Sequence, residues 1–144
     1  MMDKQNLAEA VAASMWTEDE ATRALGMELK EIAPGRASLS MTVLPSMTNG
    51  HKTCHGGYIF TLADSAFAFA CNSHNQRVVA FQCSITYLAP AFEGDVLTAA
   101  AVEVTVQGRS GIYDIHVCNQ DGARIAEFRG NSRTIKGVHI ELTP

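Results

Sequence analysis

A single aspartate lies within the longest apolar stretch of this 144-residue chain. Between Lys52 and Arg77, Asp64 is the only formally charged side chain if histidines are counted as neutral. The residues at helical spacing from it, Phe60 and Phe67 among them, offer no basic partner on the same segment. An ionised carboxylate that leaves water costs several kcal/mol unless it is paired or its pKa rises. Asp64 is therefore either a structural hydrogen-bond acceptor or a working general base or nucleophile.

A loop with two consecutive glycines leads into this segment. It runs from Asn49 to Gly57 with the sequence NGHKTCHGG. Gly56 and Gly57 allow a ligand to approach the backbone closely, and a helix N-terminus directs free N–H groups outward. Such donors suit the oxyanion that develops when a carbonyl is attacked. The alternative is a flexible entry into the helix without a ligand. His55 either orients this turn, touches a substrate or is incidental.

The same loop holds a weak pattern of metal ligands. His51 and His55 stand four residues apart with Cys54 between them. We expect no metal site, because both histidines precede the predicted helix and no further ligand motif follows. No glycine-rich dinucleotide motif follows a strand and no phosphate-binding loop is found, so we expect no cofactor.

The spacing of the glycines and the aspartate limits how they can act together. Gly57 and Asp64 are seven residues apart, which is about 10 Å along a helix. Attack on a carbonyl held by the glycine amides needs contacts of about 3 Å, so one helix cannot supply both groups to one substrate. Two antiparallel copies about a two-fold axis can, if each lends Asp64 to the Gly56 region of the other. We therefore expect an active site between subunits.

The elements that position these residues follow from periodicity and turn residues. Helical spacing is expected in the first quarter, and the run TEDE at 17–20 predicts a capping box that opens a second short helix, ended by Gly26. The long helix is predicted at 57–74, and one apolar helix with a long antiparallel sheet gives an α+β architecture in which the sheet wraps the helix. The strands are predicted at 27–32, 36–43, 78–88, 96–106, 111–119 and 123–135, the last four as a meander.

Composition narrows the class of protein. Hydrophobic residues make up 47% of the chain and charged residues 18%, which predicts a single folded domain over 1–144 with 1–25 as a helical extension. The formal net charge of −4 disfavours binding to nucleic acid or an anionic membrane. No apolar run suffices for a membrane span and no secretory signal is visible, so we expect a cytoplasmic protein with reduced thiols at Cys54, Cys71, Cys83 and Cys118.

Several motifs together resemble a known family. Asn49, the His55-Gly56-Gly57 triplet and the run 62–64 (LAD), followed by an apolar helix and four strands, resemble the hotdog-fold acyl-CoA thioesterases. The resemblance covers about residues 20–136 and implies a long central helix wrapped by a five- to six-stranded antiparallel sheet. The stretches 54–57 (CHGG), 62–68 (LADSAFA), 113–115 (YDI) and 128–130 (FRG) are similar to the subfamily of phenylacetic acid degradation proteins.

The resemblance implies a hydrolase that splits phenylacetyl-CoA or its ring-hydroxylated forms in aromatic catabolism, with coenzyme A as part of the substrate. It assigns Asp64 the role of general base or nucleophile and the Gly56 N–H that of polarising the thioester carbonyl. It assigns Asn49 to holding water or the carboxylate, and His55 to shaping the turn near the thioester. It also implies a homotetramer, a dimer of dimers, with active sites at subunit interfaces.

Some positions depart from the family pattern or leave choices open. Some relatives carry a hydroxyl side chain where this chain has Ala68 or Ala80, so Ser65 or another group would have to hold the water. Arg129 and Arg133 share one face of the last predicted strand by two-residue periodicity, and with Gly57 they are the expected substrate-binding residues. The alternative for each arginine is an ordinary surface charge.

Two other functions remain open from sequence. Hydratases and dehydratases of acyl thioesters share the fold, but the proline-rich turns typical of them are not found around His51 or His55. A non-catalytic acyl-CoA sensor would keep a pocket but would have no need of Asp64 on an apolar helix.

Overall fold

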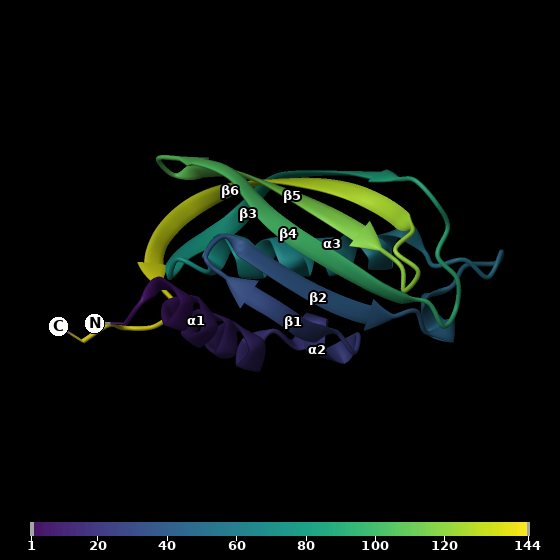
Figure 1. Cartoon of the computed structure of the whole chain (residues 1–144), viewed down its shortest axis with the longest axis horizontal. Helices are drawn as coiled ribbons and strands as arrows, with labels where there is room; N and C mark the ends of the chain where they lie inside the picture. Colours follow the sequence, from purple (N-terminus) through teal and green to yellow (C-terminus); the bar gives the residue numbers. More distant parts are fainter. Residues whose placement is uncertain (1, 144) are drawn as a thin grey trace.

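The computed structural model describes residues 2–143 and consists of one curved sheet that wraps a long helix (Figure 1). The helix, α3 (Gly56–Asn72), lies along the inner face of the sheet, and the shorter helices α1 (Lys4–Glu18) and α2 (Glu20–Ala24) lie beside its β1 edge. This arrangement confirms the predicted α+β architecture. The strands are β1 (Glu28–Ala33), β2 (Arg36–Thr42), β3 (Gln76–Tyr87), β4 (Val96–Gln107), β5 (Ser110–Cys118) and β6 (Arg124–Val138), and a short 3-10 turn spans Pro45–Met47.

The order of the strands differs from the predicted meander. All neighbouring pairs are antiparallel, in the order β1-β2-β4-β5-β6-β3. The prediction was right for β4-β5-β6, which are joined by hairpins at Gly108 and Gly122, both with positive φ. It was wrong for β3, which pairs with β6 at the far edge. The connection from β3 to β4 contains Pro90 and forms no tight hairpin, so nothing local forces these two strands together.

The core lies between α3 and the inner face of the sheet. Side chains alternate inward and outward along β5, where Tyr113, Ile115 and Val117 are buried, as a sheet covered on one face requires. From α3, the Phe67 ring packs against the rings of Tyr113 and Phe128, with centroids 5.6 and 6.1 Å apart. This aromatic cluster fixes the rotation of α3 about its own axis and therefore which helix residues stay outside the core.

The second helix begins differently from the prediction. α1 continues through Glu18, and Asp19, not Thr17, caps α2. The Asp19 carboxylate accepts hydrogen bonds from the backbone N–H of Thr22 at 3.0 Å and from its hydroxyl at 2.7 Å. An aspartate that binds both donors is a better N-cap than a threonine two residues earlier. Gly26, with φ +72°, directly follows the last residues of α2 as expected.

Three further predictions from the sequence concern the bounds of the long helix, membrane-spanning segments and the cysteines. The long helix begins one residue before the predicted position and ends at Asn72 instead of 74, where Ser73 caps it. Within the described residues no helix is long and apolar enough to cross a membrane. All four cysteines are free thiols.

Gly130 on β6 offers a test of this packing. A Cβ at this position would lie 2.7 Å from three ring atoms of Phe67. We expect Gly130→Ala to lower the free energy of unfolding by about 1–3 kcal/mol, because the ring must leave its rotamer or the strand must move. Urea denaturation measures the change. Gly50→Ala, where an added Cβ meets no atom within 4 Å, is the matched control and should stay within about 0.5 kcal/mol; equal effects of the two substitutions would contradict this packing.

Candidate active site

The first turn of α3 leaves one backbone amide free. His55 is the N-cap, and its Nδ1 accepts a hydrogen bond from the Gly57 N–H at 3.0 Å. The Tyr58 N–H donates to the His55 carbonyl oxygen at 3.0 Å. Among the hydrogen bonds of residues 2–143, none engages the N–H of Gly56. Of the two glycines that the sequence singles out, Gly56 therefore presents a free donor while the Gly57 N–H is already used.

The bond from Gly57 also fixes the state of the His55 ring. A nitrogen that accepts from an N–H carries no proton, so the proton of the neutral imidazole is on Nε2. His55 thus shapes the turn through Nδ1 and keeps Nε2–H as a donor. This arrangement agrees with the expected role of His55 in orienting the loop.

A cavity of about 470 Å³ opens at Gly56. Its lining comes from the loop before α3, from the helix and from the connection between β3 and β4. The lining residues are Thr53, Cys54, Gly56, Ile59, Tyr87, Leu88, Ala89, Pro90 and Ala91. A mainly apolar cavity with one backbone donor at its wall fits an apolar acyl or thioester group whose carbonyl needs a hydrogen bond.

Asn49 lies in the loop that precedes the helix and holds that loop together. Its Oδ1 accepts from the His51 N–H at 2.9 Å and from the Thr53 N–H and hydroxyl at 3.3 and 3.1 Å. The carbonyl oxygen is thereby committed to the loop, and the amide nitrogen is the group left to meet water or a carboxylate. Its expected contact with the catalytic water stays a prediction.

Asp64 lies about two turns farther along α3, on a face outside the core. Its side chain is partly buried, and burial, followed by the negative charge of Asp19, raises the pKa of its carboxyl above the ordinary value of 3.8. Neither a hydrogen bond nor a cation from the described part of the chain offsets this rise. Burial and then the charge of Asp64 raise the pKa of the Cys83 thiol on β3.

Ser65 does not supply the hydroxyl that the sequence lacks beside Asp64. The Thr22 hydroxyl donates to Asp19, so the Ser65 hydroxyl, 2.8 Å away, must donate to Thr22. Ser65 is therefore buried in a link between α3 and α2 and its proton is used there. The alternative that Ser65 positions the water is not supported by this geometry.

The two arginines lie away from the cavity. Arg129 and Arg133 share the outer face of β6, because Phe128, Gly130 and Ser132 between and beside them are buried. The Arg129 guanidinium forms two hydrogen bonds with the Asp114 carboxylate, at 2.7 and 2.9 Å. The Arg133 guanidinium lies 5.2 Å from the centroid of the Phe81 ring on β3. The periodicity prediction is confirmed, and the binding of CoA phosphates by either residue stays a prediction.

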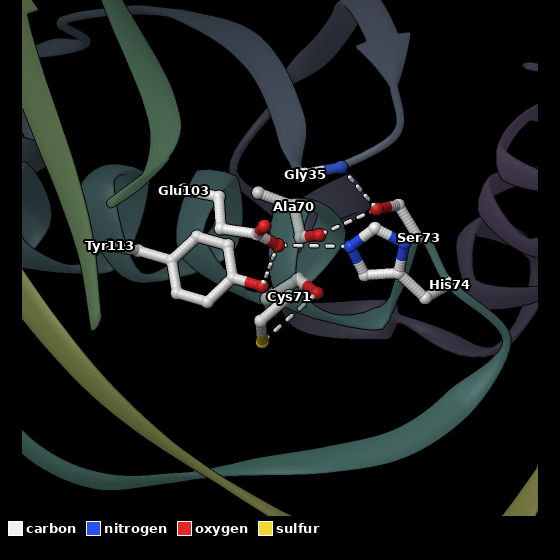
Figure 2. A network of polar contacts seen from close by, with 8 residues as sticks. Gly35, Ala70, Cys71, Ser73, His74, Glu103 and Tyr113 are labelled. Carbon is white, nitrogen blue, oxygen red and sulfur yellow. Dashed lines mark hydrogen bonds and ion pairs between the residues drawn. The ribbon is translucent and has the colours of Figure 1, made fainter. Parts of the chain in front are cut away.

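A polar network fixes the other end of α3 (Figure 2). Glu103 on β4 accepts from the Tyr113 hydroxyl at 2.8 Å, and the same oxygen lies 2.9 Å from His74 Nε2. Burial alone would raise the pKa of Glu103, but the hydrogen bonds from His74 and Tyr113 lower it below its ordinary value. Ser73 accepts from the Gly35 N–H at 2.8 Å. The helix is thus tied to the sheet at its C-terminal end.

Tyr87 is a residue of the site that sequence reasoning missed. Its hydroxyl donates to the Gly56 carbonyl oxygen at 2.9 Å, across 31 residues of sequence. No local pattern marks this tyrosine, since it simply ends an edge strand. Among residues 2–143 no group of three His, Cys, Asp or Glu side chains converges as metal ligands.

Comparison with known proteins places the chain in a family. The thioesterase superfamily matches residues 51–126. Acyl-coenzyme A thioesterase PaaI of Escherichia coli strain K12 is 46% identical over 128 residues, which are 88% of this chain and 91% of that protein. The structure of the E. coli PaaI protein from the phenylacetic acid degradation operon has a TM-score of 0.93 at 42% identity, covering 94% of this chain and 99% of that one.

A second similar structure is a hypothetical thioesterase from Streptococcus pneumoniae TIGR4, solved with coenzyme A. It has a TM-score of 0.75 at 26% identity and covers 78% of this chain and 90% of that one. The chain belongs to the thioesterase superfamily, and its wrapped helix is the hotdog fold. Within the superfamily it is a hydrolase of the PaaI type.

The raised pKa of Asp64 predicts a pH-dependent stability. The folded protein disfavours the charged carboxylate, so Asp64 weakens folding above its folded pKa and has no effect below 3.8. We expect Asp64→Asn to be more stable than the wild type near pH 7 and the difference to shrink as the pH falls toward about 4. Urea denaturation across this range measures it. A variant less stable than the wild type near pH 7 would show that the carboxylate serves as a structural acceptor.

Proposed function

We propose that this acyl-CoA thioesterase of the PaaI type hydrolyses phenylacetyl-CoA and ring-hydroxylated phenylacetyl-CoA to the free acid and CoA in phenylacetate catabolism. The name and operon of the similar E. coli protein support the acyl group. The coenzyme A in the similar S. pneumoniae structure supports the carrier. The observation that carries the proposal is an unpaired, partly buried carboxylate on the helix whose first turn presents a free amide.

The proposed chemistry uses the Gly56 N–H and the Asp64 carboxylate together on one thioester carbonyl. The Gly56 N–H receives the thioester oxygen and stabilises the negative charge that develops there. Asp64 either takes a proton from a water molecule that attacks the carbonyl carbon, or attacks that carbon itself to form an anhydride that water then hydrolyses. In both cases the C–S bond breaks, the sulfur of CoA leaves with the electron pair and is protonated, and the acid is released.

In our proposal the two groups come from different subunits. Helix rise separates Gly57 and Asp64 of one chain by about 10 Å. In our proposal two subunits pair about a two-fold axis with their α3 helices antiparallel, so that Asp64 of each faces the Gly56 turn of the other. Two such dimers form the tetramer. Each dimer then holds two identical sites.

The β3 edge of the sheet supports this pairing. β3 has 12 residues and lies at the edge of the sheet order, so one row of its N–H and C=O groups has no neighbouring strand within the described residues. Val79 and Phe81 on it are 44% and 69% exposed in the single chain. A long apolar edge strand is normally protected by pairing with another strand. In our proposal, pairing of the β3 strands of two subunits brings their α3 helices together.

The remaining residues complete the proposed site. Asn49, through its free amide nitrogen, holds the water or the carboxylate, and His55 keeps Nε2–H toward the thioester turn. Gly57 has no side chain to crowd His55, whereas an added Cβ would lie 3.2 Å from His55 Nδ1. Arg133 and Arg129 are the proposed contacts of the CoA phosphates, which would require Arg129 to exchange its Asp114 partner.

A panel of acyl-CoA substrates tests the proposed function. We expect thiol release from phenylacetyl-CoA and from 3- and 4-hydroxyphenylacetyl-CoA to be faster than from benzoyl-, acetyl- and decanoyl-CoA. We expect Asp64→Ala to fold and bind substrate but to lose activity by on the order of 10²–10⁴-fold, as is typical for removal of a general base. A chromogenic thiol reagent follows the reaction.

The possible results of this assay distinguish the proposed mechanism, the proposed acyl group and the alternative of an acyl-CoA sensor. Normal turnover by Asp64→Ala would contradict the mechanism, whereas a preference for decanoyl-CoA would contradict only the acyl group. Substrate binding without release by the wild type would favour the acyl-CoA sensor. Asp64→Asn serves as a closer isostere, provided that it is assayed fresh, since deamidation regenerates the acid.

A further inference from the structure

Tyr87 contacts the one glycine that presents a free amide. It ends β3, and its ring lies over the first turn of α3, where a Cβ on Gly56 would be 2.8 Å from Cζ and 2.9 Å from the hydroxyl oxygen. φ at Gly56 is not positive, so the requirement for glycine there comes from this close approach and not from backbone strain. The same tyrosine forms part of the wall of the cavity at Gly56.

The peptide group between Gly56 and Gly57 is held at both ends. Its carbonyl oxygen accepts from the Tyr87 hydroxyl at 2.9 Å, and its N–H donates to His55 Nδ1 at 3.0 Å. Two consecutive glycines have more backbone freedom than any other pair of residues. Hydrogen bonds to both ends of one peptide group restrict that freedom and strengthen each other.

The free amide of Gly56 depends on this restraint. It belongs to the preceding peptide group, whose carbonyl accepts from the Tyr58 N–H at 3.0 Å. The backbone angles at Gly56 connect the two peptide groups, so a fixed Gly56–Gly57 peptide also fixes where the Gly56 N–H points relative to the cavity. An oxyanion donor stabilises a transition state only if it is aligned before the reaction.

We propose that Tyr87 is a positioning residue of the thioester site: its hydroxyl holds the Gly56–Gly57 turn in the conformation that keeps the Gly56 N–H available to the thioester oxygen. This rests on the proposed function of Gly56. The phenol donates only while it is protonated; burial and then Cys54 raise the pKa of Tyr87 above its ordinary value of 10, so the bond persists at neutral pH.

Tyr87→Phe tests this role, because it removes the hydroxyl and keeps the ring. With the acyl-CoA that the wild type hydrolyses fastest, we expect kcat to fall about tenfold while KM stays within about twofold. The melting temperature should stay close to that of the wild type, since the ring still fills its place. Thr105→Val is the matched control: it also removes a hydroxyl that forms a hydrogen bond, but on β4 and outside the cavity lining, so kcat and KM should not change.

The result can separate this inference from the function it rests on. If the wild type hydrolyses acyl-CoA and Tyr87→Phe keeps its kcat, Tyr87 does not position the turn and the inference is overturned while the function stands. A Tyr87→Phe variant that loses activity only in proportion to its loss of folded protein also overturns it. If the wild type releases no thiol from any member of the panel, the proposed function itself fails.

Discussion

The rise of an α-helix is the constraint on which this site depends. α3 carries both the free amide at Gly56 and the unpaired carboxylate of Asp64, and a regular helix keeps them about 12 Å apart along its axis. No side-chain rotation closes that distance to the roughly 3 Å that attack on a carbonyl needs. In the proposed function a second copy of the helix supplies the missing group, and the β3 edge is the proposed surface of pairing.

Both ends of α3 are fixed by polar contacts with other elements. At the N-terminal end, His55 and Tyr87 hold the glycine turn. At the C-terminal end, Glu103 joins β4 to His74 after the helix. Between them, Ser65 is bonded to Thr22 of α2, which places the Asp19 carboxylate near enough to raise the pKa of Asp64. Asp19, which caps α2, therefore contributes to the raised pKa of the carboxyl that we propose as the reactive group.

Local patterns in the sequence predicted the elements well and their long-range pairing poorly. Alternation and turn residues located all six strands to within three residues, because burial on one face imposes a period of two. They misplaced β3, since no local signal says which edge of a sheet a strand joins. The charge isolation of Asp64 was visible in sequence. The difference between the amides of Gly56 and Gly57 was not, because it depends on the His55 rotamer, and Tyr87 reaches Gly56 only through the fold.

Subunit complementation tests the central claim, a site shared between two chains, most directly. Asp64→Ala and Gly56→Ala are each expected to be inactive alone, the second because its Cβ would displace the turn from Tyr87. In a mixed dimer, one site combines the intact Gly56 of one chain with the intact Asp64 of the other. Co-refolding equal amounts should therefore restore about a quarter of wild-type activity, since half of the dimers are mixed and each has one intact site. Mixed dimers that form but stay inactive would contradict the shared site.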